Sequence, residues 1–554
     1  MIYKIADNIL SPLGETTAQN YEAVKAGRSA MNHGDVSVTQ GLTRFEAMAV
    51  KSARHAIQDA GIDPSGNNVV LILSTTKANI EQLTVDSGQW TVDPGPAHAA
   101  KIIAKELGVI TKPIVVCNAC ISGVAAIILA QRLLEHGDYD YAIVCGADVL
   151  SEFTVSGFQS LKAVSEEPCR PFDIERLGLN LGEAAATMVL TVDSGQWNVD
   201  SGMWVIEAGA IRNDAFHISS PSKNGEGARL ALEAIGAEAV KDSLAQINAH
   251  GTATMFNDQM ESVAIERAGL NTIPVNSLKG YFGHTLGAAG ILETIITMAA
   301  LDDHTIIGTK GFEERGVSGK ILVTKDHQPT DKQRFVKMIS GFGGGNAAIM
   351  ASRTESLELK TESLEFSTLS SQLKITPERV TIDGKPLKLQ EKGGALLTEI
   401  YKRYIGDYPK YYKMDVLCRL GFVASELLLR NVKCGMRNEE CGIILFNHSS
   451  SIQADKNYQT SIADPDNYFP SPSAFVYTLP NIVTGEIAIR QHIQGETSFY
   501  ILQEKDEKMM NMIIEASFAD PGTKRILCGW IDAEDDDHFE VELTIREKTI
   551  ERRL

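Results

Sequence analysis

The chain has 554 residues, of which 44% are apolar and 22% charged, a composition typical of a folded protein rather than a disordered one. Its 52 basic and 71 acidic side chains give a formal net charge of −19. A surface of that sign repels phosphates and anionic lipids, so we expect neither nucleic acid nor membrane as a partner. The length predicts about three domain-sized units.

The N-terminal sequence and the cysteines indicate the cellular compartment of the protein. The sequence MIYKIADNILSPLG lacks the pattern of a secretion leader, and no run approaches the ~20 uninterrupted apolar residues of a membrane-spanning helix. The eight cysteines are scattered, which is too sparse for a disulfide scaffold. We therefore expect a cytoplasmic location. The CxxC pattern at 117–120 has no second pair, so we expect no metal site.

The first part of the chain, residues 1–195, alternates strand-like and helical segments. An amphipathic helix is predicted over 44–61, where apolar residues recur at helical spacing and Gly61 supplies the stop. Apolar runs typical of buried strands lie at 68–74, 113–117, 141–147 and 185–192. This alternation predicts a parallel or mixed sheet covered by helices.

The same alternation returns in residues 196–352 and predicts a second βα-rich half. Helices are expected at 227–244 and 257–268. Strands are expected at 204–211, 273–277, 320–325 and 336–342. Residues 353–375 are rich in Ser, Thr, Glu and Leu, and we interpret them as an exposed linker or edge segment.

Several segments of a third unit, residues 376–554, resemble segments of the first half in sequence pattern. The matched segments are 414–431 with 44–61, 441–451 with 68–75, 473–490 with 113–130, and 524–533 with 140–149. In this match the turn at 479–486 corresponds to the turn at 117–122 and contains no cysteine. This similarity predicts a duplicated half, although any α/β protein yields some matches of this kind.

The segment PIVVCNACISGVAAIILAQRLLEHG, at 113–137, is the first candidate for chemistry. A strand is expected to end near Cys117, and an apolar, buried helix to run over about 121–135. Cys120 would lie at the turn between them, where helix N-terminal amides lower the pKa of a thiol and can hold an oxyanion. A lone cysteine is more often inert core, and this alternative stays open on the segment alone.

Three more segments place polar residues beside glycines. They are INAHGTATMFND (247–258), SLKGYFGHTLGAAGILE (277–293) and SGFGGGNAA (340–348). The first contains His250, and the second contains Lys279 and His284. Taken singly, each has an ordinary structural interpretation as a surface or core histidine or as a turn. GFGGGN does not complete a dinucleotide-binding fingerprint.

Together, these segments resemble the motifs of the β-ketoacyl synthases. NACISG, HGTATxxND, KxxxGHxxGAAG and GFGGGN occur in that family's order, with 130 residues from Cys120 to His250 and 34 from His250 to His284. CRPFDIERLGLNLGEAAATMVL, at 169–190, resembles the stretch that closes the family's first half. A second histidine in place of an asparagine resembles the elongating type. The resemblance covers residues 1–352.

The resemblance implies an α/β fold of the thiolase type. Two similar βα-rich halves, 1–195 and 196–352, would form a layered α/β/α/β/α core. The unit at 376–554 would then be an α/β domain resembling one thiolase half. It lacks the nucleophile and both histidines, so we expect it to be non-catalytic.

The resemblance also implies roles for individual residues. Cys120 would be the nucleophile that carries the acyl group, and His250 and His284 would stabilise the enolate left when malonyl thioester loses carbon dioxide. Cys120 is preferred over Cys117, which is expected in the strand. The implied supporting and substrate-binding residues are Lys279, Glu293, Phe342, Thr252 and Thr254.

The implied activity is a decarboxylative Claisen condensation of acyl-carrier protein with malonyl-carrier protein, in fatty acid or specialised (polyketide or aryl-polyene) synthesis. The implied partners are an acyl carrier protein and a second synthase chain, as a homodimer or heterodimer, with no cofactor beyond the carrier's phosphopantetheine. Two alternatives are a non-catalytic partner resembling a chain-length factor and a thiolase acting on coenzyme A esters. Retention of Cys120, His250 and His284 disfavours the first. Thiolases tend to use a second cysteine late in the chain, and none lies between 170 and 352.

Overall fold

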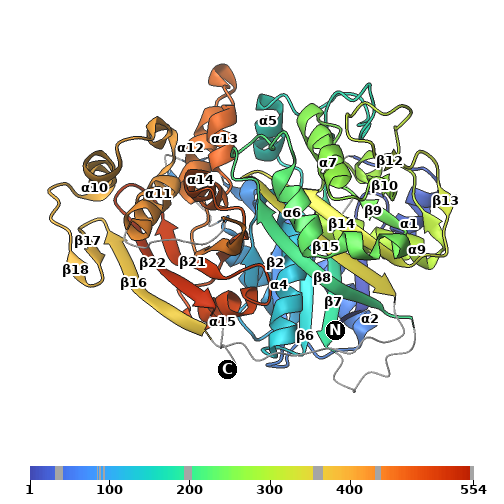
Figure 1. Ribbon diagram of the computed structural model, residues 1–554, viewed down its shortest axis with the longest axis horizontal. Coiled ribbons are helices and arrows are strands. Elements are labelled where there is room, and N and C mark those ends of the chain that lie inside the picture. Colours follow the sequence, from blue (N-terminus) through green and yellow to red (C-terminus); the bar gives the residue numbers. More distant parts are fainter. Residues whose placement is uncertain are drawn as a thin grey trace.

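The computed structural model shows two similar halves and a third unit beside them (Figure 1). It describes residues 1–31, 41–83, 85–86, 89–90, 94–192, 202–353, 366–430 and 438–548. In Figure 1 the orange and red third unit lies at the left, beside the blue and cyan first half and the green part of the second half. The first half is therefore in contact with both other parts.

The first half contains the predicted strands and helices. Its strands are β1 (Ile2–Leu10), β2 (Val69–Ser74), β5 (Ile114–Val116), β6 (Tyr141–Asp148) and β7 (Ala184–Val192). Its helices are α1 (Thr17–Lys25), α2 (Arg44–Ala60), α3 (Pro96–Leu107), α4 (Ser122–His136) and α5 (Glu152–Ser160). Strands β5, β2 and β6 are parallel, and β7 runs antiparallel to β6 and β1.

The helix ends follow from the local sequence. Thr43 and Glu46 form a capping box at the start of α2, and Gly61 ends it with a left-handed φ of 65°. Helix α4 is apolar on nearly every face because it is buried on all sides. The stretch Ala119–His136 is long and apolar enough to cross a membrane, but 89% of it is buried inside the protein, as expected of a core helix.

The second half repeats the pattern. Its strands include β8 (Trp204–Asn213), β9 (Gln246–Asn248), β10 (Pro274–Asn276), β12 (Leu322–Val323), β14 (Arg334–Ser340) and β15 (Gly345–Arg353). Its helices include α6 (Glu226–Ala234), α7 (Met255–Arg267), α8 (Lys279–Phe282) and α9 (Ala289–Asp302). The single helix predicted over 227–244 is wrong, because Gly236 takes a φ of 70° and a 3-10 segment, Ala237–Ser243, follows.

The two halves form the predicted α/β/α/β/α layers. Helices α2 and α3 cover the outer face of the first sheet, and α6 and α7 pack outside the second. Helices α4 and α9 lie between the two sheets and cross closely. A side chain at Gly123 would meet the backbone of Gly287 at 2.9 Å, so glycine is required at that crossing.

The third unit begins earlier than predicted. Strand β16 (Phe366–Thr376) pairs antiparallel with β22 (Phe539–Lys548), so of the two interpretations of residues 366–375 the edge segment is confirmed and the linker is wrong. The rest of the predicted linker, 354–365, lies outside the described residues, and Arg353 ends β15. Where burial is described, the strand alternates exposed Gln372 and Lys374 with buried Leu373 and Ile375, so its polar residues hid the strand pattern.

The remaining elements of the third unit alternate in the same way as those of the first half. The strands are β17 (Arg379–Ile382), β18 (Lys385–Pro386), β19 (Cys441–Asn447), β20 (Thr497–Ile501) and β21 (Arg525–Ala533). The helices are α10 (Gly393–Ile400), α11 (Val416–Leu429), α12 (Ile452–Ile462), α13 (Pro472–Tyr477), α14 (Ile482–Gln491) and α15 (Glu507–Ser517).

The third unit has the same sheet topology as the first half. Hydrogen-bonded neighbours run β5–β2–β6–β7–β1 in the first half and β20–β19–β21–β22–β16 in the third unit, with the same parallel and antiparallel relations. One part of the predicted match was wrong. Segment 473–490 forms helices α13 and α14, whereas the counterpart of β5 is β20, so the turn after β20 corresponds to the turn that contains Cys120.

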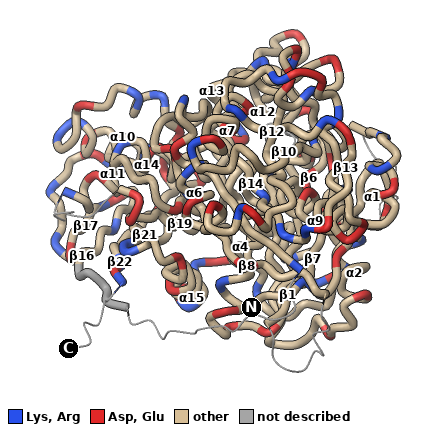
Figure 2. The backbone as a smooth tube through the Cα atoms, turned by 45° about the vertical axis from the view of Figure 1, so that its right-hand side comes forward, with Lys and Arg blue, Asp and Glu red and all other residues tan. Residues whose placement is uncertain are grey.

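The first half and the third unit join through sheet and through buried ion pairs. Strand β20 pairs antiparallel with β5, which makes one continuous sheet and covers the free edge of β5. Buried ion pairs cross the same boundary: Arg132 with Glu496 at 2.7 Å, and Lys77 with Asp455. Figure 2 shows acidic and basic residues interspersed over all three parts, so the negative charge is not confined to one segment.

Candidate active site

Cys120 lies where the first sheet meets the central helix. Strand β5 ends at Val116, and one 3-10 turn, Ala119–Ile121, leads into α4. Ala119 has a φ of 49°, a backbone conformation that residues other than glycine rarely adopt, so the backbone turns sharply just before the cysteine. The thiol therefore lies at the amino end of α4, as the sequence predicted.

His250 follows β9 in a loop that two buried carboxylates hold. The backbone N–H groups of His250 and Gly251 donate to Glu261 at 2.8 and 2.7 Å. Asp258 accepts the N–H of Thr252 at 2.9 Å. These bonds fix the backbone on both sides of the imidazole.

His284 lies in the turn between α8 and α9. Its N–H donates to the carbonyl of Asn180 at 2.7 Å, and its carbonyl accepts from Gly182 at 3.1 Å. Both ring nitrogens of His284 and the Nδ1 of His250 are buried without a hydrogen-bond partner among the described residues. Buried polar atoms left unpaired are costly, so these nitrogens point to a bound group that would pair with them.

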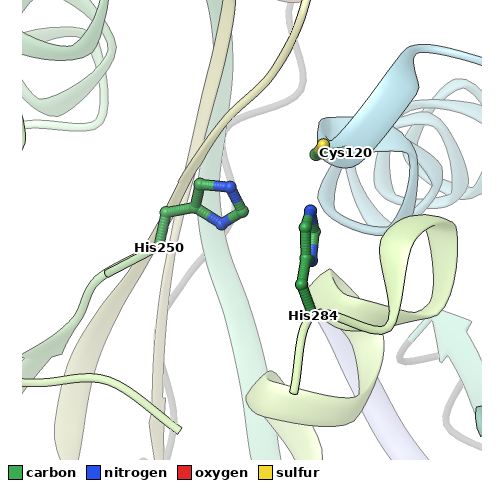
Figure 3. Close-up of side chains that lie close together, drawn as sticks. All are labelled: Cys120, His250 and His284. Atoms are coloured by element: carbon green, nitrogen blue, oxygen red, sulfur yellow. The ribbon is translucent and has the colours of Figure 1, made fainter. Parts of the chain in front are cut away.

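The three side chains converge, although they are remote in sequence. The Cys120 sulfur and a nitrogen of each ring lie within 4.8 Å of one another, and the two ring centroids are 4.9 Å apart. Figure 3 shows the thiol and both imidazoles pointing toward one small space. The exposed fractions are 7% for Cys120, 3% for His250 and 1% for His284. A single thioester carbonyl could therefore meet all three groups.

Burial sets the protonation of this cluster. It lowers the pKa of His250 and of His284 well below the ordinary value, and the nearby Lys279 ammonium lowers both further. Burial also raises the pKa of the Cys120 thiol to about 12, although the N–H groups of Cys120 and Phe342 act in the lowering direction. The sequence analysis expected the amides at the helix terminus to lower the pKa of this thiol. That expectation was wrong, because burial raises the pKa by more than the amides lower it.

A buried ion cluster lies beside the histidines. Lys279 donates to one oxygen of Glu293, as the sequence suggested, and Lys337 donates to the other. All three side chains are almost fully buried. Sequence analysis missed Lys337, although a single lysine inside the apolar run FVKMIS was a signal that could have identified it.

The cysteine and histidines open into a pocket of about 350 Å³. Thr252 and Thr254 line it, and their hydroxyls are 2.9 Å apart. Phe342 also lines it and stacks on Phe158 with ring centroids 5.9 Å apart. The structure thus brings the predicted substrate-binding threonines and the predicted aromatic residue to the same pocket as the cysteine.

The third unit contributes to the surroundings of the thiol. Asn481, at the start of α14, donates through its side-chain N–H to the carbonyl of Phe342 at 2.9 Å. Phe475 and Leu479 close a small second cavity, about 20 Å³, on the far side of Cys120. Sequence analysis missed these residues, because no local motif marks a side chain that supports a site in another unit.

Two family models match the chain over the parts that contain these side chains. "Beta-ketoacyl synthase, N-terminal domain" matches residues 9–195, and "Beta-ketoacyl synthase, C-terminal domain" matches residues 203–313. Cys120 lies in the first match, and His250 and His284 lie in the second.

Curated relatives agree with these matches. The 3-oxoacyl-[acyl-carrier-protein] synthase 2 of Vibrio cholerae is 29% identical over 402 residues, which cover 62% of this chain and 97% of the relative. The tetracenomycin polyketide synthase ketoacyl synthase alpha subunit of Streptomyces glaucescens is 31% identical over 350 residues, which cover 56% of this chain and 81% of the relative.

Solved structures share the fold. The PfaC keto synthase–chain length factor has a TM-score of 0.77 at 15% identity and covers 99% of this chain and 78% of its own, so the likeness extends over the third unit. The ketosynthase ApeO in complex with its chain length factor ApeC, from Xenorhabdus doucetiae, has a TM-score of 0.55 at 24% identity over 64% of this chain and 98% of its own.

Proposed function

This chain belongs to the β-ketoacyl synthase family, and from that premise we propose that it joins an acyl group from a carrier protein to malonyl-carrier protein with loss of carbon dioxide. The observation that carries the proposal is the convergence of one thiol and two imidazoles in a buried pocket, where three of the four ring nitrogens have no partner among the described residues. Those groups match the two needs of the reaction, a nucleophile for a thioester and donors for an enolate.

The first step moves the acyl group onto the enzyme. The sulfur of Cys120 attacks the thioester carbonyl, and the backbone N–H groups of Cys120 and Phe342 hold the oxyanion that forms. The carbon–sulfur bond to the carrier breaks, and the thiol proton of Cys120 ends on the released pantetheine sulfur. Because burial raises the pKa of the thiol, the proton must leave as the carbon–sulfur bond forms. A neutral imidazole can accept this proton and then pass it to the pantetheine sulfur.

The second step makes the carbon nucleophile. Malonyl thioester loses carbon dioxide, and the electron pair of the broken carbon–carbon bond passes into the thioester carbonyl. His250 and His284 donate hydrogen bonds to the resulting enolate oxygen. The enolate carbon then attacks the acyl carbonyl on Cys120, and the departing Cys120 thiolate takes up a proton. Each donor of this kind is typically worth about 2.7–4 kcal/mol in the transition state.

Lys279 and Glu293 support the histidines without touching substrate, and Thr252 and Thr254 border the path of the pantetheine arm. The chain needs no cofactor of its own for these steps, since phosphopantetheine arrives with the carrier. The described cysteines are free thiols, which fits the proposed cytoplasmic location.

The third unit acts as a built-in, non-catalytic partner. Strand β20 occupies the edge of β5 within one chain, so this contact needs no second chain. The second synthase chain expected from the sequence is thus replaced, at this edge, by residues of the same chain. Light scattering on the purified protein tests this: a mass of one chain is expected, and a stable dimer would contradict it.

Mass spectrometry tests the proposed activity. Incubation with an acyl-carrier protein should add one acyl mass to the peptide containing Cys120, and Cys120→Ala should lose the adduct. Cys117→Ala is the matched control, because Cys117 is fully buried three residues earlier and should not matter for labelling. A protein that takes no acyl group from any carrier would instead favour a purely structural, chain-length-factor-like role. Labelling by coenzyme A esters alone would favour a thiolase.

A further inference from the structure

The ion cluster beside the histidines contains two lysines and one glutamate. Glu293, on α9, accepts from Lys279 through one carboxylate oxygen and from Lys337, on β14, through the other. The exposed fractions of the three side chains are 3%, 1% and 0%. One buried carboxylate therefore faces two buried ammonium groups.

Lys337 is also tied to the backbone that presents His250. Its Nζ lies 3.3 Å from the carbonyl oxygen of Ala249, the residue before the histidine, and donates to it. On the sheet, Lys337 is the register partner of Asn248 in the parallel pair of β14 and β9. The lysine thus connects the carboxylate on α9 with the loop that carries one of the two imidazoles.

A lysine in this position is costly unless it has a role. The other residues of β14 from Phe335 to Ile339 are buried and apolar, and a buried ammonium loses its hydration. Replacement of buried ion clusters by apolar side chains is often neutral or stabilising. The energetic cost of Lys337 points to a task in the site rather than to stability.

The charges around Lys337 favour neutral imidazoles. The groups that face it are Glu293 on α9, Lys279 on α8 and Glu261 on α7. Burial raises the pKa of Glu261 and lowers that of Lys337, whereas the Glu293 carboxylate that accepts from Lys337 raises the pKa of the lysine and favours its charged form. After burial and Lys279, the Lys337 charge is a further cause of the lowered pKa of His250 and of His284.

We propose that Lys337 is a positioning residue of the condensation: it fixes Glu293 and the Ala249 carbonyl, and with them the loop that presents His250, and it adds a second positive charge beside the two imidazoles. The inference rests on the proposed function of the two histidines. A neutral imidazole donates one N–H to the enolate oxygen. An imidazolium would instead pair with the malonyl carboxylate, stabilise the ground state and oppose loss of carbon dioxide.

The pH dependence of malonyl-carrier protein decarboxylation tests the proposal. In Lys337→Met the lost positive charge makes imidazolium formation easier, so the acid limb of the rate profile should move up by roughly one pH unit. Lys337→Arg keeps the charge and should keep the limb in place. Lys505→Met is the control, since it breaks a lysine–carboxylate pair, with Glu542, in the third unit.

A second measurement does not depend on activity. In protein labelled with ¹⁵N at the histidines, with signals assigned from His250→Asn and His284→Asn, both rings should stay neutral in the wild type down to the pH at which the fold is lost. They should titrate at higher pH in Lys337→Met. Unchanged titration in a folded Lys337→Met, or wild-type rings that are already charged at neutral pH, would overturn the role given to Lys337. A wild type that does not decarboxylate malonyl-carrier protein would refute the proposed function instead.

Discussion

The first half and the third unit have the same strand order, yet only the first half carries a candidate nucleophile. In the first half, the turn after β5 contains Cys120 and leads into α4, which is buried between two sheets. In the third unit, the turn after β20 contains no cysteine and leads into α15, which is partly exposed. The difference teaches that a duplicated half becomes reactive only when a second half supplies the histidines and closes the site.

Strands β7 and β22 show the same difference in their side chains. β7 is buried on both faces, because α9 covers one of them. β22 alternates buried residues with exposed or half-buried Glu540, Glu542, Thr544 and Arg546. The described third unit has no counterpart of α9, and the sequence of β22 is adapted to water on that face. This face of β22 is therefore suited to solvent, and Glu542, Thr544 and Arg546 line a pocket of about 380 Å³ there.

The largest effect is expected where the third unit holds the catalytic half. Lys77 of the first half donates to Asp455, to the carbonyl of Thr478 and, at 3.2 Å, to the hydroxyl of Ser451. Lys77→Met leaves the Asp455 carboxylate buried and unpaired, which should cost about 3–5 kcal/mol of unfolding free energy. Urea unfolding of the whole chain measures the loss.

The double variant and the pH dependence make this test specific. Burial already raises the pKa of Asp455 to about 6, and without Lys77 it rises further. A raised folded-state pKa means stability that is present at low pH and lost as the pH rises, so the defect of Lys77→Met should shrink below about pH 6. Lys77→Met with Asp455→Leu should recover most of the loss. An equal defect at every pH would show that the ion pair is not its source.

The second prediction concerns the histidines, which the third unit lacks. His284→Ala removes one enolate donor and should slow malonyl decarboxylation about 10²–10³-fold. Transfer of the acyl group to Cys120 should remain largely intact, because the oxyanion of that step is held by backbone N–H groups. Decarboxylation and acyl labelling are measured separately on the same protein. An equal loss of both would contradict the division of roles between the thiol and the imidazoles.

The third prediction concerns Phe475, a residue of the third unit that lies beside the thiol proposed to carry the acyl group. Phe475 lines the small cavity beside Cys120 and packs on Phe158 with ring centroids 5.5 Å apart. Phe475→Leu opens space there and should favour acyl groups one or two methylenes longer by about 10-fold, the usual scale for such a change in an apolar pocket. Acylation rates with carriers of graded chain length measure it. Phe469→Leu, at an exposed position of the same unit, is the control.

Much of this organisation could be predicted from the sequence, because strong local patterns carry it. Cys120, His250 and His284 stand in distinctive motifs, and the strands of the first half are continuous apolar runs. Strand β16 was missed because polar residues such as Gln372 and Lys374 interrupt its apolar ones, and β20 was misplaced because α13 is as apolar as a buried strand. Asn481 acts through a contact made only in the folded chain, so no motif marks it, whereas Lys337 was marked only by its place as a single charge in an apolar strand.

The smallest effect is expected on the outer face of the third unit. Glu540→Leu on β22 should change the unfolding free energy by less than about 0.5 kcal/mol, because Glu540 is exposed and meets no covering helix among the described residues. The contrasting change on the matching strand, Leu190→Glu, buries a carboxylate against the core that contains α9 and should destabilise the fold far more than Glu540→Leu does. Thermal unfolding and light scattering measure both. A Glu540→Leu protein that gains stability or assembles into larger species would mean that this face meets an apolar partner, and the third unit would then be an incomplete half.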